Sequence, residues 1–412
     1  MICTECVIPI PLKKLIAGQG GFGDCQYCQK PGMCLQDETV LEYIKERILE
    51  SFRTLEELSH IEQHIFFHGS DKITPSEFWA IVQDDYTVGT DAFVERAINY
   101  LEEDLALDEH GETQIWALDD GTLARNVYEE RWQKFVLDTH HGYRFFNFAA
   151  KEFLDSLFDF ACHDKKLRPE LLTTLKDDQL LFRARKVSER RKCDEFDKFP
   201  ETALGPAPAA KAGDQRMTPS GISAMYCAFD RETCLSEIRA ITGDLVVSGA
   251  FTPVTQLKFL DLRMLQEMSK ISAHPFDKGY VETCHAHRFL CLLINKLSKP
   301  KSSSDTLGYI STQVVFEYLR LRFKGQVSGL IFPSVQTGLV GTNAVLFPES
   351  AVIAPKGYKI ENEDPLGHSD PFSDPIPTLQ FRAGSLVWHK IKAVKTQSED
   401  YDDLMDYVLA DF

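Results

Sequence analysis

Apolar side chains between residues 38 and 165 recur at spacings of three and four, which is the period of one face of an α-helix. The clearest stripe consists of Leu41, Ile44, Ile48, Leu49, Phe52, Leu55 and Leu58. Shorter stripes run from Phe93 to Leu101 and from Phe145 to Phe160. Turn-forming residues at 68–71 and 119–121 separate them. The pattern predicts an all-helical domain of roughly four to six helices over residues 38–165.

After Pro169 the chain changes to short apolar runs bounded by turn residues, which is typical of β-strands. We predict strands at 179–185, 225–229, 245–251, 257–262, 329–332 and 344–347, with helices at 231–241, 279–297 and 308–322. The third and fourth strands are predicted to form a pair joined at Thr252-Pro253. Because helices and strands do not alternate regularly, the pattern indicates an α+β fold rather than a series of βαβ units.

The 412-residue chain carries 45 Lys and Arg against 62 Asp and Glu, for a formal net charge of −17. This balance opposes nonspecific nucleic-acid binding, which requires clustered basic side chains over the phosphates. A local basic groove or a small anionic ligand stays compatible with it. No run reaches the about 20 apolar residues of a membrane-spanning helix, and the first residues lack a signal-peptide pattern. We therefore expect a cytoplasmic location, no membrane partner and reduced cysteines.

Two Cys-x-x-Cys pairs stand near the start of the chain, Cys3 with Cys6 and Cys25 with Cys28. Each pair turns two thiolates toward one cation, and four thiolates form a closed tetrahedral Zn²⁺ site. Glycines between the pairs ease the turn. The spacing predicts a structural zinc ion, with a set of free thiols as the alternative. Cys34 lies nearby and is not expected to be a ligand.

Two further patterns are weaker. His285 and His287 follow Cys284 in a predicted helix, but side chains two residues apart point to different helix faces, which opposes a shared metal. Arg53 and His60 match the Arg-x6-His spacing of helical nucleases of the HEPN type. A spacing this short arises by chance in a long helix, so we favour a solvated helix face over an RNase role.

The second half of the chain carries an unusual set of polar residues. Arg183 lies inside an apolar strand, where a charge is costly unless it is paired. Arg216 precedes a turn into the strand of Tyr226, and Glu237 lies on a short helix beside apolar neighbours. A buried Arg–Glu pair would be a purely structural explanation. Two arginines near an acid and an aromatic ring also suit a bound pyrophosphate and a flat base.

The order of these motifs resembles the RES domain, a family named for its Arg, Glu and Ser residues. In order, the motifs are Leu181-Phe182-Arg183-Ala184-Arg185, Arg216-Met217-Thr218-Pro219-Ser220-Gly221-Ile222, Tyr226-Cys227-Ala228, Glu237-Ile238-Arg239, Tyr309-Ile310-Ser311-Thr312-Gln313, and Pro333-Ser334 followed by Asn343-Ala344-Val345-Leu346-Phe347. The resemblance covers about 170–350. The upstream arrangement, with its paired cysteines and helical region, looks like the subfamily in which a HEPN-like domain precedes the RES domain.

The resemblance implies a fold similar to ADP-ribosyltransferases, with two small sheets around a cleft for NAD⁺. It implies a bacterial toxin that cleaves the nicotinamide–ribose bond of NAD⁺ as its substrate, with water or phosphate as acceptor, and an antitoxin or regulatory protein as partner. On this basis Arg183 would hold the phosphates or ribose, Arg216 would be the second cation and Tyr226 would pack against the nicotinamide. Glu237 would bind the nicotinamide ribose and stabilise the positive charge that develops on it.

The same resemblance implies that Ser334 completes the catalytic set by binding phosphate or the acceptor. Asn343 and Arg185 are further candidates for cofactor binding. Two alternatives stay open, an ADP-ribosyltransferase that modifies a macromolecule and a non-catalytic sensor that keeps the cleft for an NAD-type ligand.

The predicted organisation has four parts. A zinc-ribbon-like segment spans residues 1–36 and the helical domain 38–165, followed by the RES domain at 170–355 and an acidic extension at 356–412. Within the RES domain, the Pro/Ala-rich stretch at 203–214 and the segment at about 265–305 are expected to be insertions.

Overall fold

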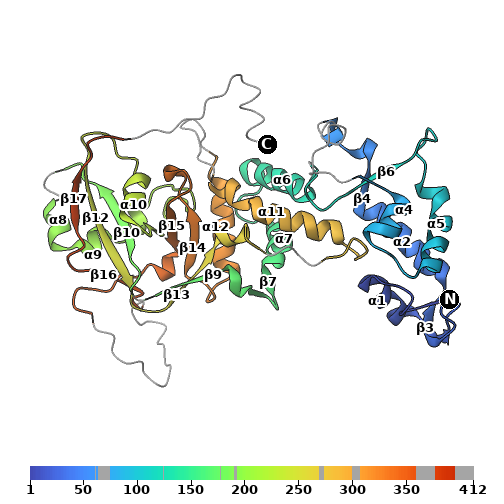
Figure 1. Cartoon of the computed structure of the whole chain (residues 1–412). Helices are drawn as coiled ribbons and strands as arrows, with labels where there is room; N and C mark the ends of the chain where they lie inside the picture. The colour runs from blue at the N-terminus through green and yellow to red at the C-terminus, as the bar shows by residue number, and fades with distance from the viewer. Residues whose placement is uncertain are drawn as a thin grey trace. The chain divides into compact units, whose positions relative to one another are not determined.

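The structure is a computed structural model that describes residues 1–60, 62–63, 75–123, 125–176, 178–189, 193–268, 273–298, 307–358 and 376–394 (Figure 1). It divides into two compact units. Unit 1 comprises Met1–Lys165 and Leu265–Lys296, and unit 2 comprises Lys166–Met264 and Leu297–Phe412. In the part of the chain that is described, no helix is long and apolar enough to span a membrane. Helices and a mixed sheet together confirm the predicted α+β class.

Unit 1 begins with a small three-stranded sheet that holds the paired cysteines. Its strands are β1 (Ile2–Cys3), β2 (Gly21–Asp24) and β3 (Pro31–Leu35), in the order β1-β3-β2, and helix α1 (Ile10–Gln19) connects the first two. Gly20 ends this helix at a point of close backbone approach. A Cβ on Gly20 would lie 2.6 Å from the carbonyl oxygen of Cys34, so only glycine fits there.

Most residues of the first two predicted stripes lie in the core of unit 1, although Leu49 is 48% exposed. The helices are α2 (Asp37–Ser51), α4 (Phe78–Ala80), α5 (Asp91–Leu105), α6 (Val127–His141) and α7 (Phe148–Phe158). Leu41, Ile44 and Ile48 of α2 are fully buried with Phe93 and Leu101 of α5. Asparagine side chains cap the N-termini of α6 and α7, because each accepts a hydrogen bond from a backbone N–H of the first turn.

The prediction that residues 38–165 are all-helical is wrong. Helix α2 ends at Ser51, and Phe52 begins a strand. Three short strands, β4 (Phe52–Thr54), β5 (Pro75–Glu77) and β6 (Ile115–Leu118), form an antiparallel sheet in the order β4-β6-β5, and β7 (Cys162–His163) follows later. Strands of three or four residues are too short for a period of two to stand out from a helical stripe. The predicted break at 68–71 lies outside the described residues.

The stripe predicted from Phe145 to Phe160 is only partly a helix face. Asn147 is the N-cap of α7, so Phe145 and Phe146 precede the helix and are 89% and 86% exposed. Phe153 and Leu157, inside the helix, are buried as expected.

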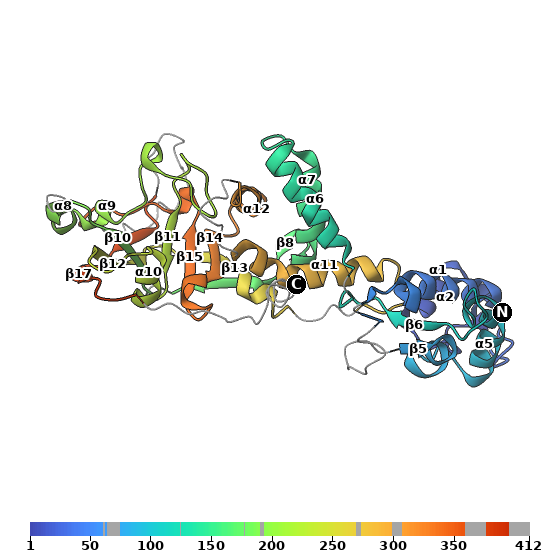
Figure 2. The same cartoon turned by 90° about the horizontal axis from the view of Figure 1, so that it is seen from above.

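Residues 265–296 fall between strands of unit 2 in sequence but pack within unit 1. Their main element is α11 (Tyr280–Ser298). Phe276 joins the core cluster of α2 and α5, and its carbonyl oxygen accepts a hydrogen bond of 2.8 Å from the Tyr43 hydroxyl. Phe289 of α11 packs against Trp132 of α6 and Phe153 of α7. Figure 2 shows α6 and α7 side by side.

Unit 2 is built on one mixed sheet of nine strands. The strands are β9 (Leu172–Leu175), β10 (Leu181–Lys186), β11 (Met225–Ala228), β12 (Leu245–Pro253), β13 (Leu257–Asp261), β14 (Gly329–Pro333), β15 (Thr342–Leu346), β16 (Leu379–Phe381) and β17 (Val387–Lys390), with β8 (Lys166–Leu167) preceding them. The order is β16-β12-β10-β11-β15-β14-β13-β9, and β17 pairs with β12. The sheet is therefore one continuous path, where the resemblance implies two small sheets.

Strands 245–251 and 257–262 are predicted to pair with each other, and this is wrong. β12 pairs with β10, β16 and β17, whereas β13 pairs with β14 and β9. Thr252-Pro253 does not form a turn, because Pro253 continues β12 opposite Leu379. The remaining predicted strands are present as β10, β11, β14 and β15, and the last two pair in an antiparallel register.

Short helices cover the sheet of unit 2. They are α8 (Cys193–Lys198), α9 (Pro200–Ala203), α10 (Arg231–Glu237) and α12 (Ile310–Arg322). Helix α10 lies beside β10, β11 and β15 (Figure 1). Within the predicted extension at 356–412, β16 and β17 belong to this sheet, while 359–375 and 395–412 lie outside the described residues.

Candidate functional site

A cavity of about 510 Å³ opens in unit 2 where β10, β11 and β15 face α10 and the loop before β11. Its lining residues are Phe182, Arg183, Ala184, Lys186, Asp214, Gln215, Arg216, Tyr226, Cys227, Ala228, Cys234, Glu237, Ile238, Arg239, Tyr309, Phe332 and Asn343. Four basic and two acidic side chains are among them, in a chain whose net charge is −17. The cavity is therefore a locally basic site within an acidic protein.

Glu237 ends α10 and points its carboxylate toward the ends of β14 and β15. The hydroxyl of Ser334 and the side-chain amide of Asn343 each donate a hydrogen bond of 2.6 Å to its Oε1. The register of β14 with β15 pairs Phe332 with Asn343, so Ser334 lies just beyond the paired ends of the two strands. Three predicted residues from distant parts of the sequence thus form one hydrogen-bonded group.

Gly341 explains how the loop between β14 and β15 comes so close to α10. A Cβ at this position would overlap the side chain of Thr233 on α10, so only glycine is accommodated. The carbonyl oxygen of Gly341 also accepts a hydrogen bond of 2.8 Å from the Ser334 backbone N–H. The local sequence therefore fixes Ser334 and Asn343 against the end of the helix.

Ser334 is fully buried, at 0% exposed, and does not line the cavity. Its hydroxyl is occupied by the bond to Glu237. The resemblance implies a direct role for this serine in binding phosphate or the acceptor. The geometry instead places it behind Glu237, where it orients the carboxylate.

Arg183 lies in the middle of β10, opposite Gly249, and lines the cavity. Burial lowers the pKa of its guanidinium below the usual range. Its Nη1 atom is buried and has no hydrogen-bond partner among the described residues. Neither Arg183 nor Arg216 forms an ion pair with Glu237, all three being within the described ranges, so the structural explanation by a buried Arg–Glu pair does not hold.

Asn343 has a similar unused atom. Its Nδ2 donates to Glu237, but its Oδ1 is buried and accepts no hydrogen bond from any described residue. Buried polar atoms without a partner are rare in folded proteins, and each costs about 1–3 kcal/mol. Two residues that line the cavity thus carry a buried polar atom without a partner among the described residues, a donor on Arg183 and an acceptor on Asn343.

Tyr226 lies on β11, lines the cavity and is hydrogen-bonded to the loop that precedes β11. Its hydroxyl accepts a hydrogen bond of 3.1 Å from the backbone N–H of Met217, next to Arg216, and lies 3.3 Å from the Thr218 hydroxyl. Burial raises the pKa of the Tyr226 phenol to about 12. On the other side of the loop, Gln313 of α12 donates to Asp214 and to the Gln215 carbonyl. These bonds place Arg216 at the cavity.

Arg185, like Ser334, is a predicted residue that does not line the cavity. Its Nη2 donates a hydrogen bond of 2.7 Å to the carbonyl oxygen of Gly205. Burial, followed by the neighbouring positive charge of Arg183, lowers its pKa to about 10. Arg185 therefore anchors the Pro/Ala-rich stretch rather than a ligand.

Sequence reasoning missed several lining residues. Four of them lie inside or next to the motifs that resemble the RES domain, but the sequence offers no reason to assign them a role. They are Lys186, Arg239, Tyr309 and Phe332. Cys227 and Cys234 also line the cavity, and burial raises the pKa of both thiols, that of Cys227 to about 12. Neither cysteine is therefore a thiolate available for nucleophilic attack near neutral pH.

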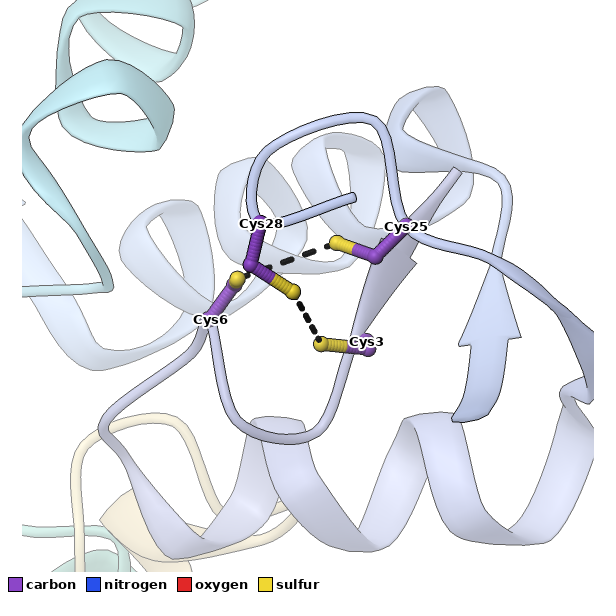
Figure 3. Close-up of side chains that lie close together, drawn as sticks. All are labelled: Cys3, Cys6, Cys25 and Cys28. Carbon is purple, nitrogen blue, oxygen red and sulfur yellow. Dashed lines mark hydrogen bonds between the residues drawn. The ribbon is translucent and has the colours of Figure 1, made fainter. Parts of the chain in front are cut away.

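The four paired cysteines form the second candidate site, in unit 1. Their sulfur atoms all lie within 4.8 Å of one another, and Figure 3 shows them converging on one point. Cys3 Sγ lies 3.7 Å from Cys28 Sγ, and Cys6 Sγ lies 3.7 Å from Cys25 Sγ. A tetrahedral Zn²⁺ with bonds of about 2.3 Å requires sulfur separations of about 3.8 Å. The group therefore has the geometry to hold a metal ion.

The environment of this group affects its thiols in opposite directions, since burial raises the pKa of Cys3 and Cys6. Burial raises the pKa of the Cys25 thiol, but the backbone N–H groups of Cys28, Tyr27 and Cys3 outweigh it and leave the value at about 6. Cys34 stays apart, since its Sγ donates to the Gly23 carbonyl at 3.4 Å. The buried carboxylate of Asp37 accepts hydrogen bonds from Gln26 and Tyr27 and so ties the cysteine loop to α2.

The two weaker patterns form no site of their own. Arg53 lies on β4 and donates to Asp119 at 2.9 Å, while His60 is exposed and shares no helix with it. His285 is buried and bonds Asp119 at 2.6 Å. The Val127 N–H donates to its Nδ1, so the proton on Nε2 faces Asp119. His287 and His285 belong to no potential metal-binding group in the described ranges.

Comparison with known families agrees with the motif order. The family model of the RES domain matches residues 181–364, which include every predicted residue of the unit 2 site. No curated protein matches the chain. The match does not extend to residues 1–180, which include the cysteine segment and the helices of unit 1 from α1 to α7.

Proposed function

We propose, from the premise that this chain contains a domain of the RES family at residues 181–364, that unit 2 binds NAD⁺ in the cavity and cleaves its nicotinamide–ribose bond. RES domains are associated with enzymes that act on NAD. The observation that carries the proposal is the fixed carboxylate of Glu237 in a basic cavity that is also lined by Arg183, whose Nη1 has no hydrogen-bond partner among the described residues.

The chemistry needs little more than this arrangement. The bond between C1′ of the ribose and the pyridinium nitrogen breaks, and its electron pair leaves with nicotinamide as a neutral molecule. Positive charge then develops at C1′ and the ring oxygen. A carboxylate held in place by two hydrogen bonds stabilises that charge without reorganising, which is how preorganised groups lower a barrier. An acceptor oxygen forms the new bond to C1′ and releases its proton to solvent.

The remaining residues bind the substrate. Arg183 and Arg216 offer guanidinium groups that can fork onto the pyrophosphate oxygens. Tyr226 presents its ring to the cavity while its hydroxyl holds the loop of Arg216. Asn343 lines the cavity beside Glu237 and would face the same ribose. Ser334 acts only through Glu237 and is a positioning residue.

The direct test is to incubate the purified full-length chain with NAD⁺, with and without inorganic phosphate, and to follow nicotinamide by chromatography. Release without phosphate indicates a glycohydrolase, and release that depends on phosphate indicates a phosphorylase. Transfer of label from NAD⁺ to a protein in a lysate would indicate an ADP-ribosyltransferase. Binding of NAD⁺ without release would indicate a sensor. The role of a bacterial toxin would follow from NAD⁺ depletion in cells that express the active chain.

For unit 1 we propose that the four cysteines hold a structural Zn²⁺. Four protein ligands close the coordination shell, so the ion would stabilise the fold without catalysing a reaction. The sulfur separations of 3.7 Å and the burial of three of the four cysteines support this.

A further inference from the structure

Arg239 has a backbone conformation that its residue type disfavours. It follows the end of α10 at Glu237 and adopts a left-handed conformation with φ +45°. Its backbone N–H closes the last turn by donating to the Ser236 carbonyl at 3.2 Å. Helices that end in this way usually carry glycine here, because a Cβ strains the left-handed conformation.

The fold does not explain why arginine occupies this position. The side chain is exposed, and no carboxylate within the described part of the chain forms an ion pair with it. By contrast, Lys186, which also lines the cavity, is paired with Asp244 at 3.1 Å. An arginine that strains the backbone and forms no ion pair with any described residue is more easily explained by binding to a ligand.

The position of Arg239 identifies that ligand by its chemistry. It lines the cavity two residues beyond Glu237, on the same wall as Ile238. A guanidinium binds phosphate oxygens through two parallel hydrogen bonds. We propose that Arg239 binds a phosphate group of the nucleotide and so makes the site selective for phosphorylated ligands. This inference rests on the proposed function, since it concerns the same cavity.

The test uses Arg239→Gly in the full-length chain, because glycine removes the guanidinium and the backbone strain together. We expect Kd for ADP-ribose, measured by calorimetry, to rise about tenfold or more. Kd for adenosine, which has no phosphate, should change less than twofold. In the absence of ligand, Tm should rise by about 1–3 °C, since glycine suits the left-handed conformation. Arg239→Lys keeps the charge but loses the fork and should weaken ADP-ribose binding by a smaller factor.

Lys165→Gly is the matched control. Lys165 is also an exposed basic residue in a left-handed conformation, with φ +64°, but it does not line the cavity. We expect a similar rise in Tm and unchanged binding of ADP-ribose. An unchanged Kd in Arg239→Gly, or an equal loss for adenosine, would overturn the role of Arg239 and leave the proposed function intact. A wild-type chain that binds neither ADP-ribose nor NAD⁺ would overturn both.

Discussion

Ser334 Oγ donates a hydrogen bond of 2.6 Å to Oε1 of Glu237, although the two residues are 97 positions apart in sequence. Asn343 donates to the same oxygen at the same distance. Both hydrogen bonds reach one carboxylate oxygen, and no described residue donates to the other, Oε2. The carboxylate is thus held in one orientation before any ligand arrives.

Removing the serine hydroxyl should therefore impair the reaction rather than substrate binding. In Ser334→Ala we expect kcat for nicotinamide release to fall by roughly 10–100-fold, since a hydrogen bond to a charged group contributes about 1.5–3 kcal/mol. KM for NAD⁺ should change little because the hydroxyl does not reach the cavity. Steady-state kinetics with chromatographic detection separates the two parameters.

Ser248→Ala is the control for the loss of a buried serine in the same unit. Ser248 is also 0% exposed, but its hydroxyl contacts Arg231 and His389 and not Glu237. We expect this variant to lose stability and keep its kcat. If both serine variants lose activity equally, the positioning role of Ser334 is wrong.

Glu237→Gln tests the charge itself. Glutamine has nearly the same shape and can still accept the hydrogen bond from Ser334. We expect nicotinamide release to fall by about 10²–10³-fold, which is typical for the loss of a preorganised group that stabilises transition-state charge. Circular dichroism and Tm should match the wild type. Wild-type turnover in this variant would remove Glu237 from the mechanism.

Arg183→Met should separate function from stability. The guanidinium is buried, and its Nη1 has no hydrogen-bond partner among the described residues. An apolar side chain of similar length therefore removes the free-energy cost of burying an unpaired charge. We expect Tm without ligand to stay the same or rise, while nicotinamide release falls by at least about 100-fold. A melting curve and the release assay on the same preparation check both.

Arg263→Met provides the contrast for that experiment. The guanidinium of Arg263 donates two hydrogen bonds to the buried carboxylate of Asp261, at 2.9 and 2.7 Å. Removing it leaves Asp261 without its charge partner, so Tm should fall by several degrees. A comparable drop in Arg183→Met would mean that Arg183 is a structural residue.

The candidate residues that line the cavity could be selected from the sequence because they stand in short motifs, whereas their roles stay predictions. Arg183, Tyr226 and Asn343 lie on strands that apolar runs identify, and Glu237 ends a helix with a clear capping residue, Asp230. The direction of a side chain was not predictable in the same way. Arg185 belongs to the same strand as Arg183, yet it bonds Gly205, and only the path of the loop at 203–208 decides this.

The fold was less predictable where contacts are long-range. The parallel pairing of β13 with β14 joins segments about 70 residues apart, and no local pattern encodes it. Residues 265–296 illustrate the same limit, since Phe276 has an apolar side chain that would suit either unit. Phe276 is buried against α2 and α5 because its shape complements theirs. The apolar periodicity of a single segment does not reveal which partner it packs against.

The variant Tyr226→Phe tests how the stability of the fold depends on pH. Burial raises the pKa of the Tyr226 phenol to about 12, whereas an unfolded tyrosine titrates near about 10. Between these values the folded chain keeps a proton that the unfolded chain has lost, so this group's contribution to stability is complete below pH 10 and falls as the pH rises toward 12. The Tm of the wild type should therefore drop more steeply from pH 9 to 11.5 than that of Tyr226→Phe. Parallel slopes would contradict the burial of this hydroxyl.

The cysteine group gives the prediction that depends least on the proposed reaction. Elemental analysis of protein purified without chelator should find about one zinc per chain, and Cys25→Ser should lose it because three ligands bind Zn²⁺ far more weakly than four. Cys34→Ser is the matched control, since Cys34 is equally buried but lies outside the group. It should keep the metal. Loss of the ion should lower the melting temperature, because the free energy of metal binding adds to the stability of the fold that forms the site. A wild-type preparation without zinc, with the four thiols freely titratable in the folded state, would show that hydrogen bonds and packing alone hold this segment together.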